Sequence, residues 1–309
     1  MTQATSPKAY CVLYNPLSST GTGEQKANIL KTMLKNSRVE FKSLLDIPDK
    51  REFLQKLDPD ITPIITGGDG TLSHFVNQLD GENPTRDIYY YPSGTGNDFL
   101  NDIGRSKDTE PFLLNPYIIN LPKIHFNGET YTFINGVGYG IDGYVCEEGD
   151  RVRKKTGKPI NYTAAALKGL LYAYKRTKAT VTVDGQTYTF NNVWMTPTML
   201  GRFFGGGMMC APTQDRMNPE GTVSLMVMRC ASKLRTLLLF PSIFKGNHIK
   251  ATKVVSMYKG HHIHVRFDRP TALQIDGEVF SGVSEYTVTT AYAEQNTAQE
   301  KNDSIPASI

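Results

Sequence analysis

The chain has 309 residues, of which 39% are hydrophobic and 21% are charged, and its formal net charge at pH 7 is +4. These values are ordinary for a folded globular protein, and they exclude a collagen-like or wholly disordered chain. So small a net charge gives no reason to expect a nucleic-acid partner, whereas the length predicts two domains, because single cores stop growing near ~250–300 residues.

The cysteines and the first residues bear on the compartment. Cys11, Cys146, Cys210 and Cys230 are scattered, with no C-x-x-C pair and no histidine at ligand spacing, so we expect reduced thiols rather than disulfides or a zinc site. The first residues lack the apolar core of a secretory signal, and no stretch approaches the ~20 apolar residues that cross a bilayer. We therefore expect a cytoplasmic protein whose contact with the inner face of the membrane is peripheral.

Short apolar runs alternate with longer amphipathic segments in the first third of the chain. Residues 10–14, 61–66 and 88–91 are predicted strands, and residues 24–35 and 71–79 are predicted helices. This alternation predicts a parallel sheet flanked by helices, a fold that binds ligands in the loops after its strands. We expect an α/β nucleotide-binding domain over residues 1–118, to which residues after 285 are candidate additions.

Near residue 118 the pattern changes to short runs in which apolar and polar residues alternate. Antiparallel strands are predicted over residues 131–134, 179–183, 187–190, 262–267 and 286–290. One segment within this series, 162–174, is rich in Ala and Leu and predicts a helix. We expect a mostly-β domain over residues 119–293, followed by a disordered tail over the polar residues 294–309.

The clearest motif lies between the predicted strand 61–66 and the helix that follows it. It consists of Thr66, Gly67, Gly68, Asp69, Gly70 and Thr71. Glycines let the backbone approach phosphate oxygens closely, and a helix N-terminus offers unpaired N–H groups to an anion. The Asp69 carboxylate would repel phosphate unless a Mg²⁺ ion lay between them. A plain glycine turn is the alternative interpretation.

Two further turns follow the other predicted strands and repeat this chemistry. One contains Gly94, Thr95, Asn97 and Asp98, and the other contains Asn15, Pro16 and Ser18 ahead of further small residues. All seven are candidate nucleotide contacts. The chain has neither a Walker A sequence nor a G-x-G-x-x-G fingerprint, which disfavours P-loop NTPases, protein kinases and ordinary dinucleotide-binding enzymes.

These motifs, taken in order, resemble the bacterial diacylglycerol-kinase-like lipid kinases, whose catalytic domain is shared with eukaryotic diacylglycerol and sphingosine kinases. The matching segments span nearly the whole chain and are Asn15-Pro16, Gly67–Thr71, Gly94–Phe99, Gly138–Asp142 and Gln274–Glu278. The resemblance implies an N-terminal α/β nucleotide-binding domain, a C-terminal antiparallel β-sandwich that holds the acceptor site, and an active cleft between the two. It also implies ATP and Mg²⁺ as cofactors and a lipid alcohol such as diacylglycerol as the acceptor, and homodimers are common in the family.

The resemblance also implies the catalytic residues. Glu278, with Asp276 beside it, would take the proton from the acceptor hydroxyl, while Asp69 and Mg²⁺ hold the transferring phosphoryl group. By sequence pattern alone, residues 276–278 favour a hairpin turn. Bacterial members hold a second, structural Mg²⁺ in the β-domain, and its counterpart here would use Met217, Glu220 and Thr222, with Glu in place of the usual Asp. An ordinary turn explains that loop equally well.

Several positions depart from the family pattern. Asn101 and Asn120 stand where bacterial members place charged residues, and no basic residue follows Asn15-Pro16, although Lys168 matches a family lysine. These departures leave open a sphingoid or other lipid kinase and a nucleotide- or lipid-binding regulator without turnover. A NAD kinase is a further alternative, because NAD kinases share the Gly-Gly-Asp-Gly turn.

The segment 233–245 has basic ends around a short apolar centre. It is too short to span a bilayer, but it could lie on an anionic membrane surface, where apolar burial and basic attraction add. A core helix with snorkelling basic ends is the favoured interpretation of this pattern.

Overall fold

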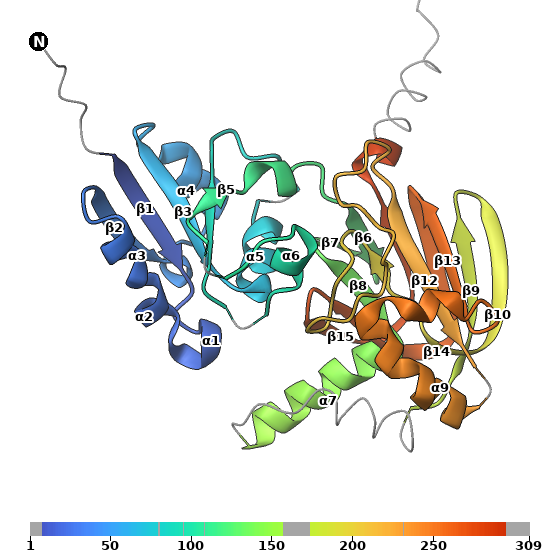
Figure 1. The fold of residues 1–309 in the computed structure, drawn as a ribbon. Coiled ribbons are helices and arrows are strands. Elements are labelled where there is room, and N and C mark those ends of the chain that lie inside the picture. Colours follow the sequence, from blue (N-terminus) through green and yellow to red (C-terminus); the bar gives the residue numbers. More distant parts are fainter. Residues whose placement is uncertain are drawn as a thin grey trace, which may run out of the picture. The chain divides into compact units, whose positions relative to one another are not determined.

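A computed structural model gives the fold of residues 8–79, 81–94, 96–107, 109–156, 174–230 and 232–294. Thr95, Lys168, nearly all of the predicted helix 162–174 and the predicted tail after residue 294 lie outside these described residues. The chain divides into two compact units, residues 1–120 and residues 121–309 (Figure 1). Among the described helices, none combines the length and apolarity needed to span a bilayer.

The first unit is built around a five-stranded sheet in the order β2-β1-β3-β4-β5. Its first four strands are parallel, and β5 is antiparallel to β4. The strands are β1 (Ala9–Tyr14), β2 (Arg38–Ser43), β3 (Ile61–Gly67), β4 (Tyr89–Pro92) and β5 (Phe112–Leu113). The predicted α/β class is therefore confirmed for this unit. β3 is buried along almost its whole length, as expected for a central parallel strand covered on both faces.

Short helices connect these strands. They are α1 (Ser18–Gly21), α2 (Gly23–Ala27), α3 (Ile29–Met33), η1 (Leu44–Asp46), α4 (Lys50–Lys56), α5 (Asp69–Asn77), α6 (Asp98–Asp102) and η2 (Asn115–Tyr117). The helix predicted over 24–35 is divided into α2 and α3 at Asn28. The helix predicted over 71–79 begins two residues earlier, at Asp69, so its first turn belongs to the glycine motif.

Arg86 fixes the start of β3. Its guanidinium donates to the carbonyl oxygens of Leu54, Leu57, Asp58 and Ile61, at 2.5 to 3.1 Å. These include the free carbonyls at the end of α4, which have no partner inside their own helix. One arginine therefore caps α4 and holds the chain where it enters the central strand.

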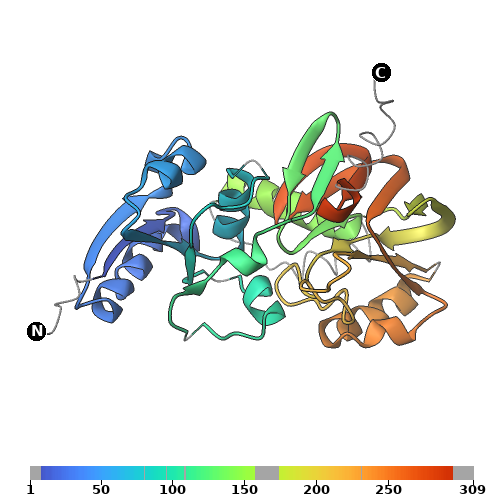
Figure 2. The ribbon, with the colours of Figure 1, turned by 90° about the horizontal axis from the view of Figure 1, so that it is seen from above.

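The second unit is a ten-stranded antiparallel sheet in the order β7-β6-β15-β14-β8-β11-β12-β10-β9, with β13 paired to β12. The strands are β6 (Lys123–Phe126), β7 (Glu129–Thr132), β8 (Gly136–Tyr139), β9 (Thr177–Val183), β10 (Gln186–Met195), β11 (Thr198–Met199), β12 (Val223–Arg229), β13 (Val255–Gly260), β14 (His262–Ile275) and β15 (Glu278–Thr289). Figure 2 shows the green hairpin of β6 and β7 at one end of this sheet. The predicted antiparallel class is confirmed.

The long strand β14 curves the sheet back on itself. Its first half pairs with β9, and its second half pairs with β8. The pairing with β15 is interrupted between Arg266 and Thr271, around Pro270, which has no N–H to donate to a ladder. The result is a closed path through β14, β8, β11, β12, β10 and β9, filled by a core in which the rings of Tyr139 and Phe267 stack at 4.0 Å.

Several helical segments of the described residues accompany this sheet. They are α7 (Ile141–Thr156), α9 (Lys233–Leu239), η4 (Phe240–Lys245) and η5 (Asn247–Lys250). Ser232 begins α9 by accepting the N–H of Arg235 on its side-chain oxygen, a common way of capping a helix N-terminus. α7 packs against β14 and β15.

Candidate active site

The sheet of the first unit places the three predicted loops side by side. Tyr14 pairs with Thr66, and Gly67 pairs with Pro92, so β1, β3 and β4 end at the same edge. The loops that follow begin at Asn15, Gly68 and Ser93. Because parallel strands present their carboxyl ends together, this edge is where an open α/β sheet binds ligands.

The loops after β3 and β4 pack backbone against backbone. The Gly67 carbonyl accepts the N–H groups of Ser93 at 2.9 Å and Gly94 at 3.0 Å, and it also accepts the buried Tyr90 hydroxyl at 2.9 Å. A Cβ atom at Gly94 would lie only 2.1 Å from the Gly68 Cα. Glycine is therefore required at Gly94 by the approach of the two loops, before any ligand is considered.

Thr66 and Thr71 support the same turn. The Thr66 hydroxyl donates to the Ser93 hydroxyl oxygen at 2.9 Å. The Thr71 side chain lies under Gly67, where an added Cβ atom would come within 2.4 Å of the Thr71 Cβ. Both threonines are buried, so they shape the loop from beneath.

Asp69 links the first glycine loop to α6. Its carboxylate accepts the N–H of Asp98 at 2.9 Å and the N–H of Phe99 at 3.1 Å. These are N-terminal amides of α6, which favour a negative charge. A carboxylate is a ligand that Mg²⁺ prefers, so the predicted Mg²⁺ contact of Asp69 stays a prediction. The two hydrogen bonds give Asp69 a structural part that the sequence did not predict.

Gly70 differs from its neighbours. It lies in the first turn of α5, has an ordinary helical backbone, and no atom of the described residues outside its own helix lies within 4 Å of a Cβ placed there. Glycine at a helical position costs about 1 kcal/mol relative to alanine. Neither packing nor backbone conformation explains why this position is a glycine. The close approach of a ligand to the backbone would explain it, because only glycine has no side chain in the way.

The loop after β1 is held by Asn15. Its side-chain oxygen accepts the Leu17 N–H at 2.9 Å, and its carbonyl accepts the Ser18 N–H at 3.1 Å. A Cβ at Gly23 would lie 2.0 Å from that carbonyl oxygen. Asn15, Pro16 and Ser18 are all partly exposed at the sheet edge, where they can contact a ligand.

The second glycine loop carries a cation that sequence reasoning missed. With its side-chain amide donating to the Gly96 carbonyl at 2.8 Å, Asn97 accepts the Lys107 ammonium on its oxygen at 3.0 Å. Asp98, the next residue, is buried. Lys107 lies ten residues after Asn97, and no spacing rule connects it to the loop. It brings a positive charge to a site that has no basic residue after Asn15-Pro16.

Asn120, the departure near the end of the first unit, has a local explanation. Its φ is 53°, in a region where asparagine is enriched. Its N–H donates to the Asn83 side-chain oxygen at 2.9 Å, and the Asn83 amide donates back to the Asn120 side chain at 3.2 Å. Asn101, the other departure, is exposed on α6.

The Asp276–Glu278 segment of the second unit is a tight hairpin. Ile275 pairs with Glu278, and the two turn residues between them, Asp276 and Gly277, have φ of 48° and 96°, which is typical of a type I′ turn. The Asp276 carboxylate accepts the N–H groups of Ile134 at 2.7 Å and of Asn135 and Gly136 at 2.9 Å.

The two carboxylates of this hairpin therefore differ in their surroundings. Asp276 anchors the connection between β7 and β8, which makes it a structural residue. Glu278 is exposed, and its carboxylate makes no hydrogen bond or ion pair within the described residues. Of the two carboxylates, the Glu278 side chain is the more exposed.

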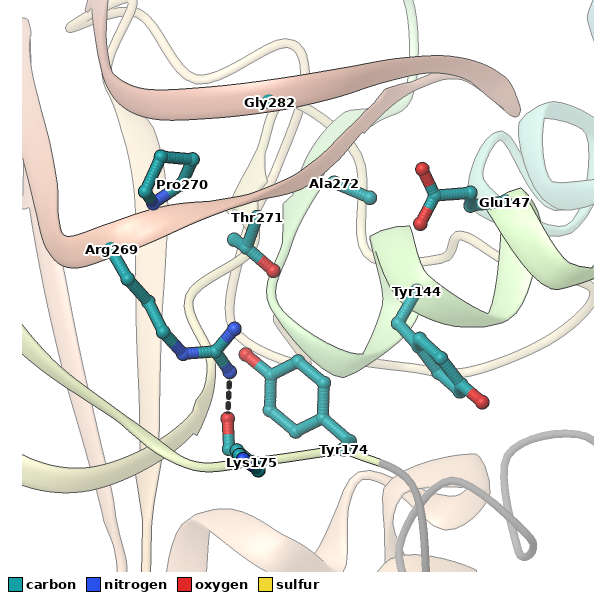
Figure 3. A pocket seen from close by; sticks show the side chains of 9 residues that line it. All are labelled: Tyr144, Glu147, Tyr174, Lys175, Arg269, Pro270, Thr271, Ala272 and Gly282. Atoms are coloured by element: carbon teal, nitrogen blue, oxygen red, sulfur yellow. Dashed lines mark hydrogen bonds between the residues drawn. The ribbon is translucent and has the colours of Figure 1, made fainter.

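A cavity of about 320 Å³ lies between α7 and the β14–β15 hairpin (Figure 3). Tyr144 and Glu147 line it from α7, and the Arg269 guanidinium lies 5.6 Å from the centre of the Tyr174 ring. Arg269 also donates to the Lys175 carbonyl. Gly282 lies four residues beyond Glu278 on β15, roughly 13 Å at the rise of an extended strand. None of these residues carried a motif in the sequence.

Asp142, at the start of α7, is a buried carboxylate. Neither of its oxygens has a hydrogen bond of ordinary geometry within the described residues. Burial raises its pKa from 3.8 to about 7, and the nearby N–H groups of Asp142 and Gly143 offset only part of this rise. Gly138 is required beside it, because an added Cβ atom would come within 1.8 Å of the carboxylate. The motif Gly138–Asp142 was found in the sequence, but its burial was not.

The predicted metal turn is closed by amides instead. The Thr222 carbonyl accepts the Gln214 amide at 2.9 Å and the Asn218 amide at 3.0 Å, which uses both of its lone pairs. The Asn218 side-chain oxygen accepts the N–H and the hydroxyl of Thr222 at 3.0 and 3.2 Å. Met217 and Glu220 are exposed. No group of three or more His, Cys, Asp or Glu residues in the described segments could hold a metal ion. This donor set does not fit a bound Mg²⁺.

Comparisons with known proteins agree with this architecture. Residues 9–116 match the family described as Diacylglycerol kinase catalytic domain, and residues 135–291 match the YegS C-terminal NAD kinase beta sandwich-like domain. The chain is 26% identical over 264 residues to a diacylglycerol kinase of Mycobacterium tuberculosis, a match that covers 82% of this chain and 83% of the relative. It is 25% identical over 232 residues to a diacylglycerol kinase of Bacillus subtilis, covering 70% of each.

A solved structure shares the fold. The crystal structure of a diacylglycerol kinase from Bacillus anthracis superposes with a TM-score of 0.62 at 17% identity, covering 93% of this chain and 95% of that chain. The two domain matches lie in the order found in the sequence and together account for most of the described residues. The chain therefore belongs to the diacylglycerol-kinase-like family of lipid kinases.

Proposed function

We propose that the protein transfers the γ-phosphate of ATP to the hydroxyl group of a lipid alcohol, with diacylglycerol as the leading acceptor and phosphatidic acid as the product. Membership of a kinase family supports a phosphotransferase that uses a nucleotide. The relatives from M. tuberculosis and B. subtilis are named diacylglycerol kinases, which favours this acceptor over sphingoid bases and NAD.

Gly70 is the observation that carries the nucleotide part of this proposal. A glycine with no steric or conformational reason, in the first turn of a helix, leaves room for a phosphate group against the free N–H groups of that turn. Asp69 beside it would hold Mg²⁺, which neutralises charge on the transferring phosphoryl group when bound. Asn15, Ser18, Gly94 and Asn97 line the same sheet edge.

Glu278 is the proposed general base. A carboxylate without internal partners can accept the proton of the acceptor hydroxyl as the phosphorus–oxygen bond forms. The cavity beside α7 is lined by Tyr144 and Tyr174 and by Gly282, which follows Glu278 on β15. It suits an elongated alcohol that has its hydroxyl at Glu278 and its remaining length along the strand.

The test is transfer of labelled γ-phosphate from Mg-ATP to separate acceptors: diacylglycerol, ceramide, sphingosine, undecaprenol and NAD. Wild type is compared with E278Q and with E285Q, a matched change of an exposed glutamate on the same strand. We expect label on diacylglycerol, a fall of ~10²–10⁴-fold in kcat for E278Q, and wild-type turnover for E285Q.

Other outcomes would replace this proposal with a named alternative. Label on NAD alone would identify a NAD kinase, and label on sphingosine alone would identify a sphingoid kinase. ATP binding without transfer to any acceptor would favour a regulator that has kept the fold and lost turnover.

A further inference from the structure

The segment α9–η4 has one face buried against the protein and one face exposed to solvent. Thr236, Phe240 and Ile243 recur at helical spacing and are buried. On the other side the exposed fractions are 66% for Leu234, 74% for Leu238 and 39% for Phe244. The sequence pattern favoured a core helix, which describes the inner face only. Figure 1 shows α9 on the outside of the β-strand unit.

Leu234, Leu238 and Phe244 form an apolar strip that stays exposed among the residues that the structure describes. Leu234 and Leu238 are one helical turn apart, so their side chains lie next to each other on the surface. Pro241, between Leu238 and Phe244, is exposed as well. Single exposed apolar side chains are ordinary, but a contiguous set with a charged rim marks an interaction surface.

The rim of this strip is basic. Lys233, Arg235, Lys245 and Lys250 are all exposed, and they alternate with or flank the apolar side chains. The chain has 30 Asp and Glu residues, yet none falls between Gly221 and Phe267. The same interval contains eight basic residues, namely Arg229, Lys233, Arg235, Lys245, Lys250, Lys253, Lys259 and Arg266. An anionic partner is therefore favoured over a neutral or cationic one.

We propose that the strip formed by Leu234, Leu238 and Phe244, with its basic rim, docks on an anionic lipid bilayer. The leucines would enter the boundary between headgroups and acyl chains while the basic residues contact lipid phosphates, and the two contributions add. A second copy of the chain is a poorer partner, because a symmetric contact of this face with itself would bring like charges together. This docking goes beyond the proposed phosphoryl transfer and needs neither nucleotide nor acceptor.

The experiment is sedimentation of the full chain with sucrose-loaded vesicles, without nucleotide. Vesicles of phosphatidylcholine alone are compared with vesicles containing 30% phosphatidylglycerol. The variants are L234S/L238S, which removes the apolar strip, and R235Q/K245Q, which removes rim charges. The matched control is I29S/M33S on α3, where two apolar side chains four residues apart are 49% and 47% exposed.

We expect wild type to bind the anionic vesicles and to be released by salt. L234S/L238S should weaken the partition coefficient by roughly 10- to 100-fold, and R235Q/K245Q by roughly 10- to 30-fold, with a flatter salt dependence. I29S/M33S should bind as wild type does. Circular dichroism melts of all variants check that each still folds.

Three results would overturn the proposal. The first is equal binding of wild type and L234S/L238S, and the second is no preference of wild type for phosphatidylglycerol. The third is a dimer in sedimentation velocity that L234S/L238S disperses, which would make this face a self-association surface. None of these readouts depends on kinase activity. A negative result would therefore overturn the membrane-docking proposal without bearing on the proposed phosphoryl transfer, which the labelling assay tests separately.

Discussion

Replacing Gly94 by alanine should disrupt the nucleotide edge of the first unit from within. The new Cβ would lie 2.1 Å from the Gly68 Cα and 2.5 Å from the Gly68 nitrogen. Ordinary van der Waals contact begins at 3.4 Å. The distance of 2.1 Å is shorter than this by about 1.3 Å, so the two loops must move apart by about that amount. Both obstacles are backbone atoms, which cannot rotate away as a side chain could.

The expected magnitude follows from this displacement. Overpacking of a closely packed site costs ~1–3 kcal/mol, and ~2 kcal/mol corresponds to a fall of about 6–8 °C in the melting temperature of a unit of this size. A shift of ~1 Å in a positioning loop can also lower turnover by ~10²-fold. G94A should therefore be both less stable and less active.

The matched control is G70A, the same substitution in the facing loop. No atom of the described residues outside its own helix lies within 4 Å of the new Cβ, so alanine should raise the free energy of unfolding by ~1 kcal/mol. If phosphate approaches Gly70 as proposed, G70A should nevertheless bind ATP more weakly. Calorimetry gives the melting temperature of each variant, and ATP titration gives the dissociation constant of each variant for ATP.

The reasoning would be refuted if G94A and G70A melted at the same temperature. Equal melting would mean that the loops after β3 and β4 do not meet at Gly68 and Gly94. Unchanged ATP affinity in the more stable G70A would separately remove the argument for a phosphate at that position.

Three further predictions concern the second unit. Burial raises the pKa of Asp142 from 3.8 to about 7. Between pH 4 and pH 7 the Asp142 carboxyl is therefore protonated in the folded protein and ionised in the unfolded chain, so the free energy of unfolding should fall as the pH rises through this range. D142N should abolish that fall, with a gain of up to ~4 kcal/mol at pH 8 and none at pH 4, measured by urea unfolding. N218A should lower the free energy of unfolding by ~1–3 kcal/mol, because the Thr222 N–H and carbonyl each lose a hydrogen-bond partner. EDTA should leave the melting temperature of the wild type unchanged. A fall of several degrees on adding EDTA would instead indicate a bound metal ion at this turn. D276A should destabilise the unit by ~2–4 kcal/mol, because three N–H groups lose their acceptor, while E278Q should melt as wild type does in the same scanning calorimetry.

Much of the first unit follows from local pattern. Strands that end in glycine or asparagine and lead into amphipathic segments specify a parallel sheet, and parallel strands bring their following loops together. The positions of Asn15, Gly68 and Gly94 at one edge therefore required no knowledge of tertiary contacts. The hairpin at Asp276 and Gly277 was equally readable, because such turns need residues that tolerate positive φ.

Features that depend on distant partners were beyond the sequence. The Asp69 carboxylate caps a helix that begins 29 residues later, and Asp276 holds amides about 140 residues earlier in the chain. Neither contact has a periodicity that a single sequence could display. The amides at the predicted metal turn were also beyond the sequence, because the Gln214 N–H group that reaches the Thr222 carbonyl comes from eight residues earlier in the chain.

The closed path through β14 and β9 also limits how this sheet can associate with others. Among the described strands of this second sheet, only β7 and β13 have a single neighbour, and both are short, with four and six residues. Exposed strand edges are templates for aggregation, and short edges with charged side chains resist it; Glu129 on β7 and Lys259 on β13 provide such charges. We therefore expect the unit to stay soluble at high concentration and any dimer to form without joining one sheet to another.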